Sequence, residues 1–182
     1  SGKSIGALYP AVKALREDEK IFFLTARNSG AEAAIKASLL LQAKNSALTS
    51  VELTARRKAC FCERVGEEKT FCPFSRGYYD RSMSATNELL SLGSAVKSEI
   101  EKVAEQHSVC PFELSLDTAT WADIVVGDLN YDFDPYVALK RFQDRERFIL
   151  LIDEAHQLAD RVKEMLSASL TLETNTFLAL TN

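Results

Sequence analysis

The stretch Arg147–Gln157, RFILLIDEAHQ, decides the expected fold of this chain. Five consecutive apolar residues, 148–152, run directly into two acids, Asp153 and Glu154, which are followed by Ala155 and His156. A short run that is apolar throughout is typical of a strand buried in a parallel sheet, because helices cover both faces of such a sheet. Ligands bind at the carboxyl ends of parallel strands, so the two acids are candidate site residues.

The first residues of the chain supply a matching phosphate-binding pattern. Gly2-Lys3-Ser4 has the ending of a P-loop, in which the lysine contacts the β- and γ-phosphates and the hydroxyl binds Mg²⁺. A helix amino end behind the loop presents further N–H groups to the anion. In the same chemistry Asp153 is the candidate ligand of Mg²⁺, and Glu154 is the candidate residue for activating the attacking water. The two patterns together predict ATP hydrolysis.

Composition bounds the class of protein. The chain has 182 residues, of which 46% are hydrophobic and 26% charged, as in a folded domain that carries an insertion. No apolar run approaches the roughly 20 residues of a membrane span, and the amino end has no signal-peptide pattern. We therefore expect no membrane association and a reducing, cytoplasmic compartment. Because the chain starts in mid-motif, we also expect it to be a segment of a longer polypeptide.

The net charge of -4 gives no indication of nucleic-acid binding, which usually goes with a surplus of basic residues, but one stretch is locally basic. Between Arg56 and Arg81 there are seven basic residues and four acids. A solvated loop face is the simpler explanation of such a patch, and contact with a phosphate backbone is the functional one.

The order of predicted elements indicates an α/β fold with a parallel sheet. Helical patterns cover residues 5–15, with Pro10 as an expected kink, and residues 31–44. Strand patterns cover residues 20–25, 51–54 and 121–129, and residues 130–135 are typical of a turn. In the intervening stretch Gly93 separates two helical segments, whose apolar positions are Leu89, Leu92, Val96, Ile100 and Val103.

This alternation divides the chain into three parts. Residues 1–54 form the first part of the predicted α/β domain, residues 55–117 an insertion, and residues 118–182 the continuation. An insertion of this length is too long for an ordinary loop, so we expect a mainly helical subdomain. We also expect the sheet to be a separate packing unit from it.

All four cysteines, Cys60, Cys62, Cys72 and Cys110, lie in the predicted insertion. Disulfides are rare in a reducing compartment, so a metal site explains the clustering better. Four thiolates suit zinc or an iron-sulfur cluster, and the spacing does not decide between them. Only one residue separates Cys60 from Cys62, fewer than the two to four usual between zinc ligands. The spacing therefore leaves open whether both of these cysteines are metal ligands.

These segments, in this order, resemble the first motor domain of the XPD/DinG-like family of superfamily 2 DNA helicases. The similarity rests on GKS, LTAR after the second predicted strand, the four-cysteine insertion, CPFELSLDTATWADIVVGDLNYDFDP and LLIDEAH. Within that family, TFCPFSRGYYDR and HSVCPFELSLD are most similar to bacterial members.

The resemblance implies a RecA-like P-loop NTPase sheet interrupted by a [4Fe-4S] subdomain, with ATP as substrate and Mg²⁺ as cofactor. It implies translocation on single-stranded DNA and 5'-to-3' unwinding of duplex DNA, and a nucleoid-associated protein if the source is bacterial. By position, Gly2, Lys3, Ser4 and Asp153 bind nucleotide and Mg²⁺, and Glu154 is catalytic. His156 couples the ATP site to the DNA track, and Thr25 and Arg27 contact the strand. Cys60, Cys62, Cys72 and Cys110 are the implied cluster ligands.

A second hypothesis from a different class is a non-catalytic nucleic-acid-binding module. In that hypothesis the cysteines hold structural zinc or a redox-sensing cluster, and nucleotide binding only switches the conformation. The intact set of Lys3, Ser4, Asp153 and Glu154 favours the enzyme.

Overall fold

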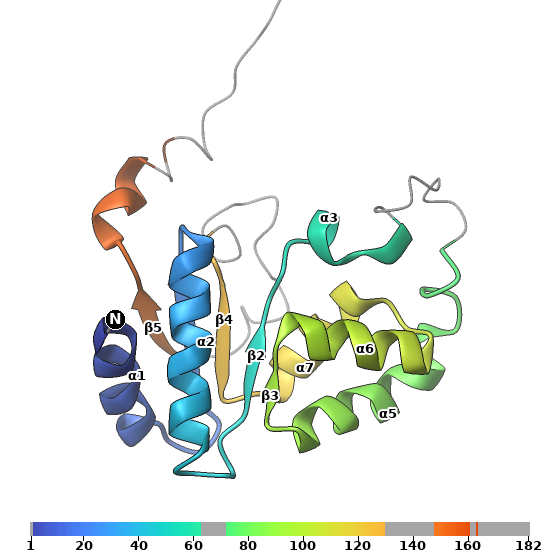
Figure 1. Cartoon of the computed structure of the whole chain (residues 1–182), viewed down its shortest axis with the longest axis horizontal. Helices are drawn as coiled ribbons and strands as arrows, with labels where there is room; N and C mark the ends of the chain where they lie inside the picture. The colour runs from blue at the N-terminus through green and yellow to red at the C-terminus, as the bar shows by residue number, and fades with distance from the viewer. Residues whose placement is uncertain (1, 63–71, 130–147, 161–162, 164–182) are drawn as a thin grey trace, which may run out of the picture.

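The chain forms one parallel sheet, which confirms the predicted α/β class. The computed structural model describes residues 2–62, 72–129, 148–160 and 163. Its five strands have the order β3-β2-β4-β1-β5, and the four strand pairs are all parallel (Figure 1). The strands are β1 (Lys20–Thr25), β2 (Ser50–Glu52), β3 (Ser94–Ala95), β4 (Ile124–Asp128) and β5 (Phe148–Ile152).

The predicted helices are present with shifted ends. The helical elements are α1 (Gly2–Ala14), α2 (Asn28–Gln42), α3 (Arg56–Ala59), α5 (Tyr78–Ser91), α6 (Lys97–His107), α7 (Pro111–Trp121) and the 3-10 helix η3 (Ala155–Gln157). Helix α1 runs through Pro10. Gly93 separates α5 from α6 as predicted, with a φ of +76° that favours glycine. Among the described residues, no helix has the length and apolar character needed to cross a membrane.

Side-chain alternation along the strands builds a separate core on each face of the sheet. Ile21 is in register with Ile124, and Phe23 with Val126, and these four pack with buried residues of α1 and α2 such as Leu8. On the other face, Val125 packs with residues of α5, α6 and α7, and the partly buried Phe22 lies against that core. Helices therefore cover both faces, as in doubly covered parallel sheets.

The predicted insertion shares its core with the sheet, so the expectation of a separate packing unit is wrong. Strand β3, which the sequence patterns did not reveal, pairs with β2 at Ser50↔Ser94 and Val51↔Ala95. Val51 belongs to one buried cluster with Leu89 of α5, among others. The segments before and after the predicted insertion also contact each other. The Thr49 N–H and hydroxyl both donate to Asp123 Oδ2, at 2.7 and 2.8 Å. The boundaries at residues 55 and 117 themselves stay a prediction.

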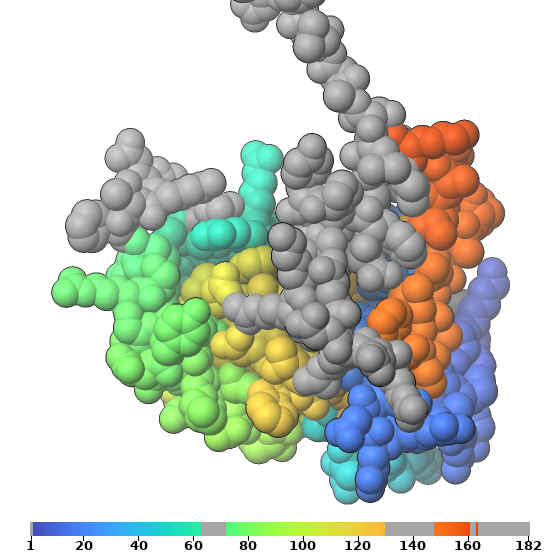
Figure 2. All heavy atoms as spheres, turned by 180° about the vertical axis from the view of Figure 1, so that it is seen from behind, coloured from blue at the N-terminus to red at the C-terminus, as the bar shows by residue number. Residues whose placement is uncertain are grey.

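Two details of the predicted strands differ in the structure. Strand β5 is partly exposed rather than buried, with Phe148 46% exposed, because it lies at an edge of the described sheet. Trp121, predicted to begin a strand, ends α7 and is 71% exposed. Residues 130–135, predicted as a turn, lie outside the described residues. Viewed from behind, β5 lies beside α1 on one flank and α5 occupies the other (Figure 2).

Candidate functional site

Polar side chains gather where the parallel strands end. Thr25 ends β1, Glu52 ends β2, Asp128 ends β4, and Asp153 follows β5. Because these strands run in the same direction, all four residues lie at one edge of the sheet. This edge is the candidate functional site, and it contains the acid that the sequence singled out.

The two adjacent acids, Asp153 and Glu154, have different backbone conformations. The Asp153 N–H donates to the Leu24 carbonyl at 2.8 Å, so Asp153 continues the pairing between β5 and β1. Glu154 has φ 57° and ψ 41°, a left-handed conformation that a non-glycine residue adopts at some energetic cost. This turn breaks the strand alternation between the carboxylates. The Glu154 Oε2 atom then lies 3.4 Å from Nδ1 of His156, whose side chain is exposed.

The amino end of α1 lies beside the carboxyl end of β5 (Figure 1). Gly2 and Lys3 are exposed there, and Ser4 is buried. The first N–H groups of a helix have no intrahelical partners, and the helix dipole makes this end attractive to anions. No acidic residue stands in the first turn of α1. The predicted phosphate-binding residues and the predicted acids are thus on neighbouring elements.

Thr25 and Arg27 have different surroundings. Thr25 is 2% exposed, and its hydroxyl is engaged with the backbone of Arg27, accepting from the N–H and donating to the carbonyl at 3.2 Å each. Arg27 is exposed and precedes the first residue of α2. Within this segment, Arg27 is available to a ligand, whereas Thr25 fixes the turn that presents it.

A cavity of about 300 Å³ opens next to this turn. Three cationic side chains from separate segments line it, together with three acids. The cations are Arg27, Lys58 and Lys97, and the acids are Glu32, Glu52 and Asp128. The lining of the cavity includes residues of the sheet edge and of the helices α2, α3 and α6.

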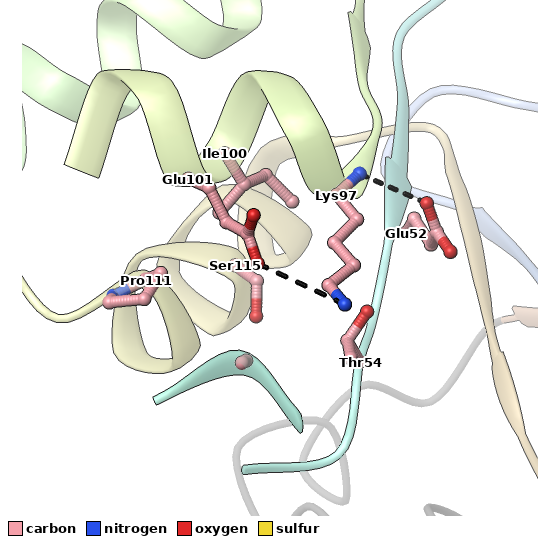
Figure 3. A pocket seen from close by; sticks show the side chains of 8 residues that line it. Glu52, Thr54, Lys97, Ile100, Glu101, Pro111 and Ser115 are labelled. Atoms are coloured by element: carbon pink, nitrogen blue, oxygen red, sulfur yellow. Dashed lines mark hydrogen bonds and ion pairs between the residues drawn. The ribbon is translucent and has the colours of Figure 1, made fainter. Parts of the chain in front are cut away.

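Glu52 joins the sheet to helix α6. Its Oε2 atom accepts from the backbone N–H of Lys97 at 2.9 Å, and Lys97 is the first residue of α6. Figure 3 shows this bond, with the Lys97 ammonium turned toward Glu101, 3.9 Å away. The adjoining cavity of about 10 Å³ has room for roughly one water molecule and no larger ligand. Sequence patterns gave no signal for this link, because no motif contains Glu52.

The four cysteines lie in two pairs. The Cys62 and Cys72 sulfurs are 3.0 Å apart, and edge-to-face stacking of Phe61 on Phe74 holds their segments together. Cys60 follows α3 and Cys110 precedes α7, which are linked by the Arg56 guanidinium 6.0 Å from the Phe112 ring. All four cysteines are in the described part of the chain, and none forms a disulfide.

The pKa values of the Cys72 and Cys110 thiols are shifted in opposite directions. Burial alone would raise the pKa of Cys72, but hydrogen bonds from the Cys62 thiol, from the Phe74 and Ser75 backbone and from the Ser75 side chain lower it overall. Burial raises the pKa of Cys110, and the proximity of Cys60 adds to the rise. A bound metal cation would hold both thiols in the deprotonated, thiolate form despite this difference in pKa.

Four cysteine sulfurs are suitable ligands for a metal ion or cluster, although in this structure they do not surround a common centre. Two thiolates on tetrahedral zinc stand about 3.8 Å apart, as follows from a Zn–S distance of about 2.3 Å. The 3.0 Å contact between Cys62 and Cys72 is a thiol hydrogen bond instead. Among the described residues, no three His, Cys, Asp or Glu side chains are grouped as a metal site. The Nε2 atom of His107 pairs with Oε2 of Glu88 at 2.7 Å.

Solved structures share this fold. A structure titled "XPD_Helicase" superposes with a TM-score of 0.58 at 20% identity, over 90% of this chain and 29% of that chain. A structure titled "Truncated XPD" gives a TM-score of 0.56 at 20% identity, over 92% of this chain and 48% of that chain. At this identity the likeness concerns the fold, which is the RecA-like sheet that the sequence predicted.

Sequence relatives point in the same direction. The chain is 26% identical over 118 residues to "Regulator of telomere elongation helicase 1 homolog" of Caenorhabditis briggsae, covering 64% of this chain and 12% of that protein. It is 30% identical over 99 residues to the Caenorhabditis elegans protein of the same name, covering 52% of this chain and 10% of that protein. The chain thus spans about a tenth of the length of these curated relatives.

The family assignment comes from a longer match. The sequence model of the DEAD_2 family matches residues 25–174, which include the strand ends, the cysteines and both acids. The resemblance to XPD/DinG-like helicases is confirmed at the level of the family, whereas the similarity to bacterial members in particular has no support. The chain therefore belongs to the DEAD_2 family.

Proposed function

We propose that this chain is the first motor segment of an ATP-dependent DNA helicase. The observation that carries the proposal is that the amino end of α1 lies beside β5, whose carboxyl end is followed by Asp153 and Glu154. The named relatives are helicases, which supports this function over a non-catalytic binding module. Both acids and the Lys3-Ser4 pair are intact, so the side chains proposed to bind phosphate and Mg²⁺ and to activate water are present in this sequence.

At the nucleotide, each side chain has a separate task. Gly2 allows close approach of the phosphates, the Lys3 ammonium offsets their charge, and the Ser4 hydroxyl and Asp153 carboxylate hold Mg²⁺. Glu154 accepts a proton from the attacking water, while His156, 3.4 Å from its carboxylate, links this event to the strand-binding side.

On the strand side, Arg27 contacts a DNA phosphate from the mouth of the 300 Å³ cavity. Thr25 acts through Arg27, since its hydroxyl is bonded to the Arg27 backbone. Such contacts position a single strand without reading its sequence, as a translocating motor requires.

The four cysteines form the proposed ligand set of a [4Fe-4S] cluster. The support is the donor type and the pairing of Cys62 with Cys72 and of Cys60 with Cys110. When bound, the cluster supplies a rigid cross-link between α3, the Cys72 segment and α7. Structural zinc is the competing occupant, and metal analysis separates the two.

We expect Cys72→Ser and Cys110→Ser to lose iron and to abolish unwinding in the full-length protein. ATP binding should persist, because α1 and the inward side chains of β5 pack in the core on the opposite face of the sheet from Cys110. Iron and sulfide analysis, unwinding and nucleotide binding measure these effects. Cys60→Ser and Cys62→Ser test the tight spacing, since a variant of a non-ligand keeps its iron.

Phe74→Leu is the matched control for the cysteine variants. It loosens the aromatic contact with Phe61 beside Cys72 and removes no sulfur. Full iron content with normal unwinding in both the Cys72 and Cys110 variants would contradict the cluster assignment. Zinc in place of iron in the wild-type protein would support the structural-zinc reading.

A strand-displacement assay tests the helicase function itself. We expect the full-length protein to unwind a partial duplex that has a 5' single-stranded overhang, in an ATP-dependent manner, and to leave the matching 3'-overhang substrate intact. The 3'-overhang duplex serves as the control for non-specific melting. DNA binding without ATP turnover would instead favour the binding module.

A further inference from the structure

Gly30 lies where two groups of the proposed mechanism meet. It is buried, it is the third residue of α2, and its φ is not in the left-handed region. A Cβ atom added there would overlap Thr25 Oγ1 and would lie 2.8 Å from Asp153 Oδ2 and 3.1 Å from Thr25 Cβ. Glycine is thus required at this position for space rather than for backbone conformation.

The crowding joins three elements that are distant in the sequence. Thr25 ends β1, Gly30 is in the first turn of α2, and Asp153 follows β5. Asp153 is held to Leu24 by its backbone N–H, and Thr25 is held to Arg27 by its hydroxyl. The Asp153 carboxylate and the Thr25–Arg27 turn therefore lie against the same face of Gly30.

Electrostatics favours the same arrangement. The first turn of α2 has no acidic residue of its own, and its amino end carries the positive end of the helix dipole. The Asp153 carboxylate lies against this turn and supplies the missing negative charge. Its position is thus fixed by the helix amino end as well as by the backbone bond to β1.

We propose that Gly30 is a positioning residue that keeps the Mg²⁺-binding carboxylate of Asp153 and the strand-binding turn at Arg27 in contact. This inference rests on the proposed function. The two atoms nearest to an added methyl group, Thr25 Oγ1 and Asp153 Oδ2, are ends of short side chains and can rotate away, and Thr25 Cβ at 3.1 Å requires only a small shift. A methyl group at position 30 therefore leaves the fold in place and displaces the two functional groups from each other.

Gly30→Ala in the full-length protein tests this inference. We expect the Mg²⁺ concentration for half-maximal ATPase to rise at least about tenfold, because small displacements of catalytic groups are costly. The single-stranded DNA concentration for half-maximal ATPase stimulation should rise together with it. A purely structural role would lower the melting temperature without moving either midpoint.

Gly6→Ala is the matched control, because Gly6 is an exposed helical glycine with nothing within 4 Å of an added Cβ. We expect both midpoints to stay at the wild-type values in that variant. In the double variant Thr25→Ala/Gly30→Ala the added Cβ still lies 2.8 Å from Asp153 Oδ2, so the Mg²⁺ midpoint should stay raised, and the DNA midpoint should stay raised because Arg27 loses its turn.

Wild-type midpoints in Gly30→Ala would overturn the inference, and so would loss of the folded circular dichroism spectrum, which would make Gly30 a packing residue only. A double variant with a wild-type Mg²⁺ midpoint would overturn it as well. Asp153→Asn keeps these outcomes distinct from failure of the proposed function. Unchanged ATPase in Asp153→Asn contradicts the proposed function itself, whatever Gly30→Ala does.

Discussion

Lys3→Ala is expected to lower ATP turnover in the full-length protein by at least about a hundredfold, because its ammonium is proposed to offset the charge of the phosphates. The fold should survive, since Lys3 is exposed at the start of α1. Steady-state ATPase and circular dichroism measure the two effects.

Lys13→Ala is the control for this experiment. Lys13 is also an exposed lysine of α1, but it lies in the last turn, 5.9 Å from the Tyr9 ring and at the end opposite to the proposed phosphates. Its variant should retain wild-type turnover. If Lys3→Ala also kept wild-type ATPase, the interpretation of the amino end as a phosphate site would be wrong.

Glu154→Gln is expected to keep ATP binding and to slow hydrolysis by about a hundredfold to ten-thousandfold. The amide fills the same space but accepts no proton from water. The backbone demands of the left-handed position are the same for both side chains, so the local turn should persist. Single-turnover hydrolysis and binding of a fluorescent nucleotide separate chemistry from affinity.

The control for Glu154→Gln is Glu32→Gln, an exposed acid of α2 that borders the 300 Å³ cavity. This change removes the same charge at a position without a proposed catalytic task, and hydrolysis should be unchanged. Loss of ATP binding in Glu154→Gln would show that Glu154 is structural, and undiminished hydrolysis would remove it from the proposed chemistry.

The sheet was predictable because its strands carry strong local patterns. The apolar runs at residues 20–25 and 148–152 fix two strands, and their position between helical segments predicts parallel pairing. Strand β3 was not predictable, because two residues, Ser94 and Ala95, carry no strand pattern of their own. Its pairing follows from tertiary packing of the helices that flank it.

The site was predictable where chemistry requires a residue type, and not where packing places it. Lys3 and Asp153 belong to sequence patterns with a known mechanism, so the elements that carry them could be expected to lie next to each other. The contact of Gly30 with Asp153 and Thr25 depends on the distance between α2 and β5, which no spacing in the sequence encodes. Glu52 was missed for the same reason, since its partner is a backbone N–H of a distant helix.

The pairing of β2 with β4 has a consequence for how the chain acquires its structure. Thr49 and Asp123, at the starts of these two strands, are 74 residues apart, and everything between them must be spanned before the sheet can close. Loop closure of this length is slow when the intervening chain is unstructured, and it becomes easier once that chain has collapsed. We therefore expect helices α5 to α7 to form first and to bring β4 to β2. Destabilising these helices should then delay completion of the sheet.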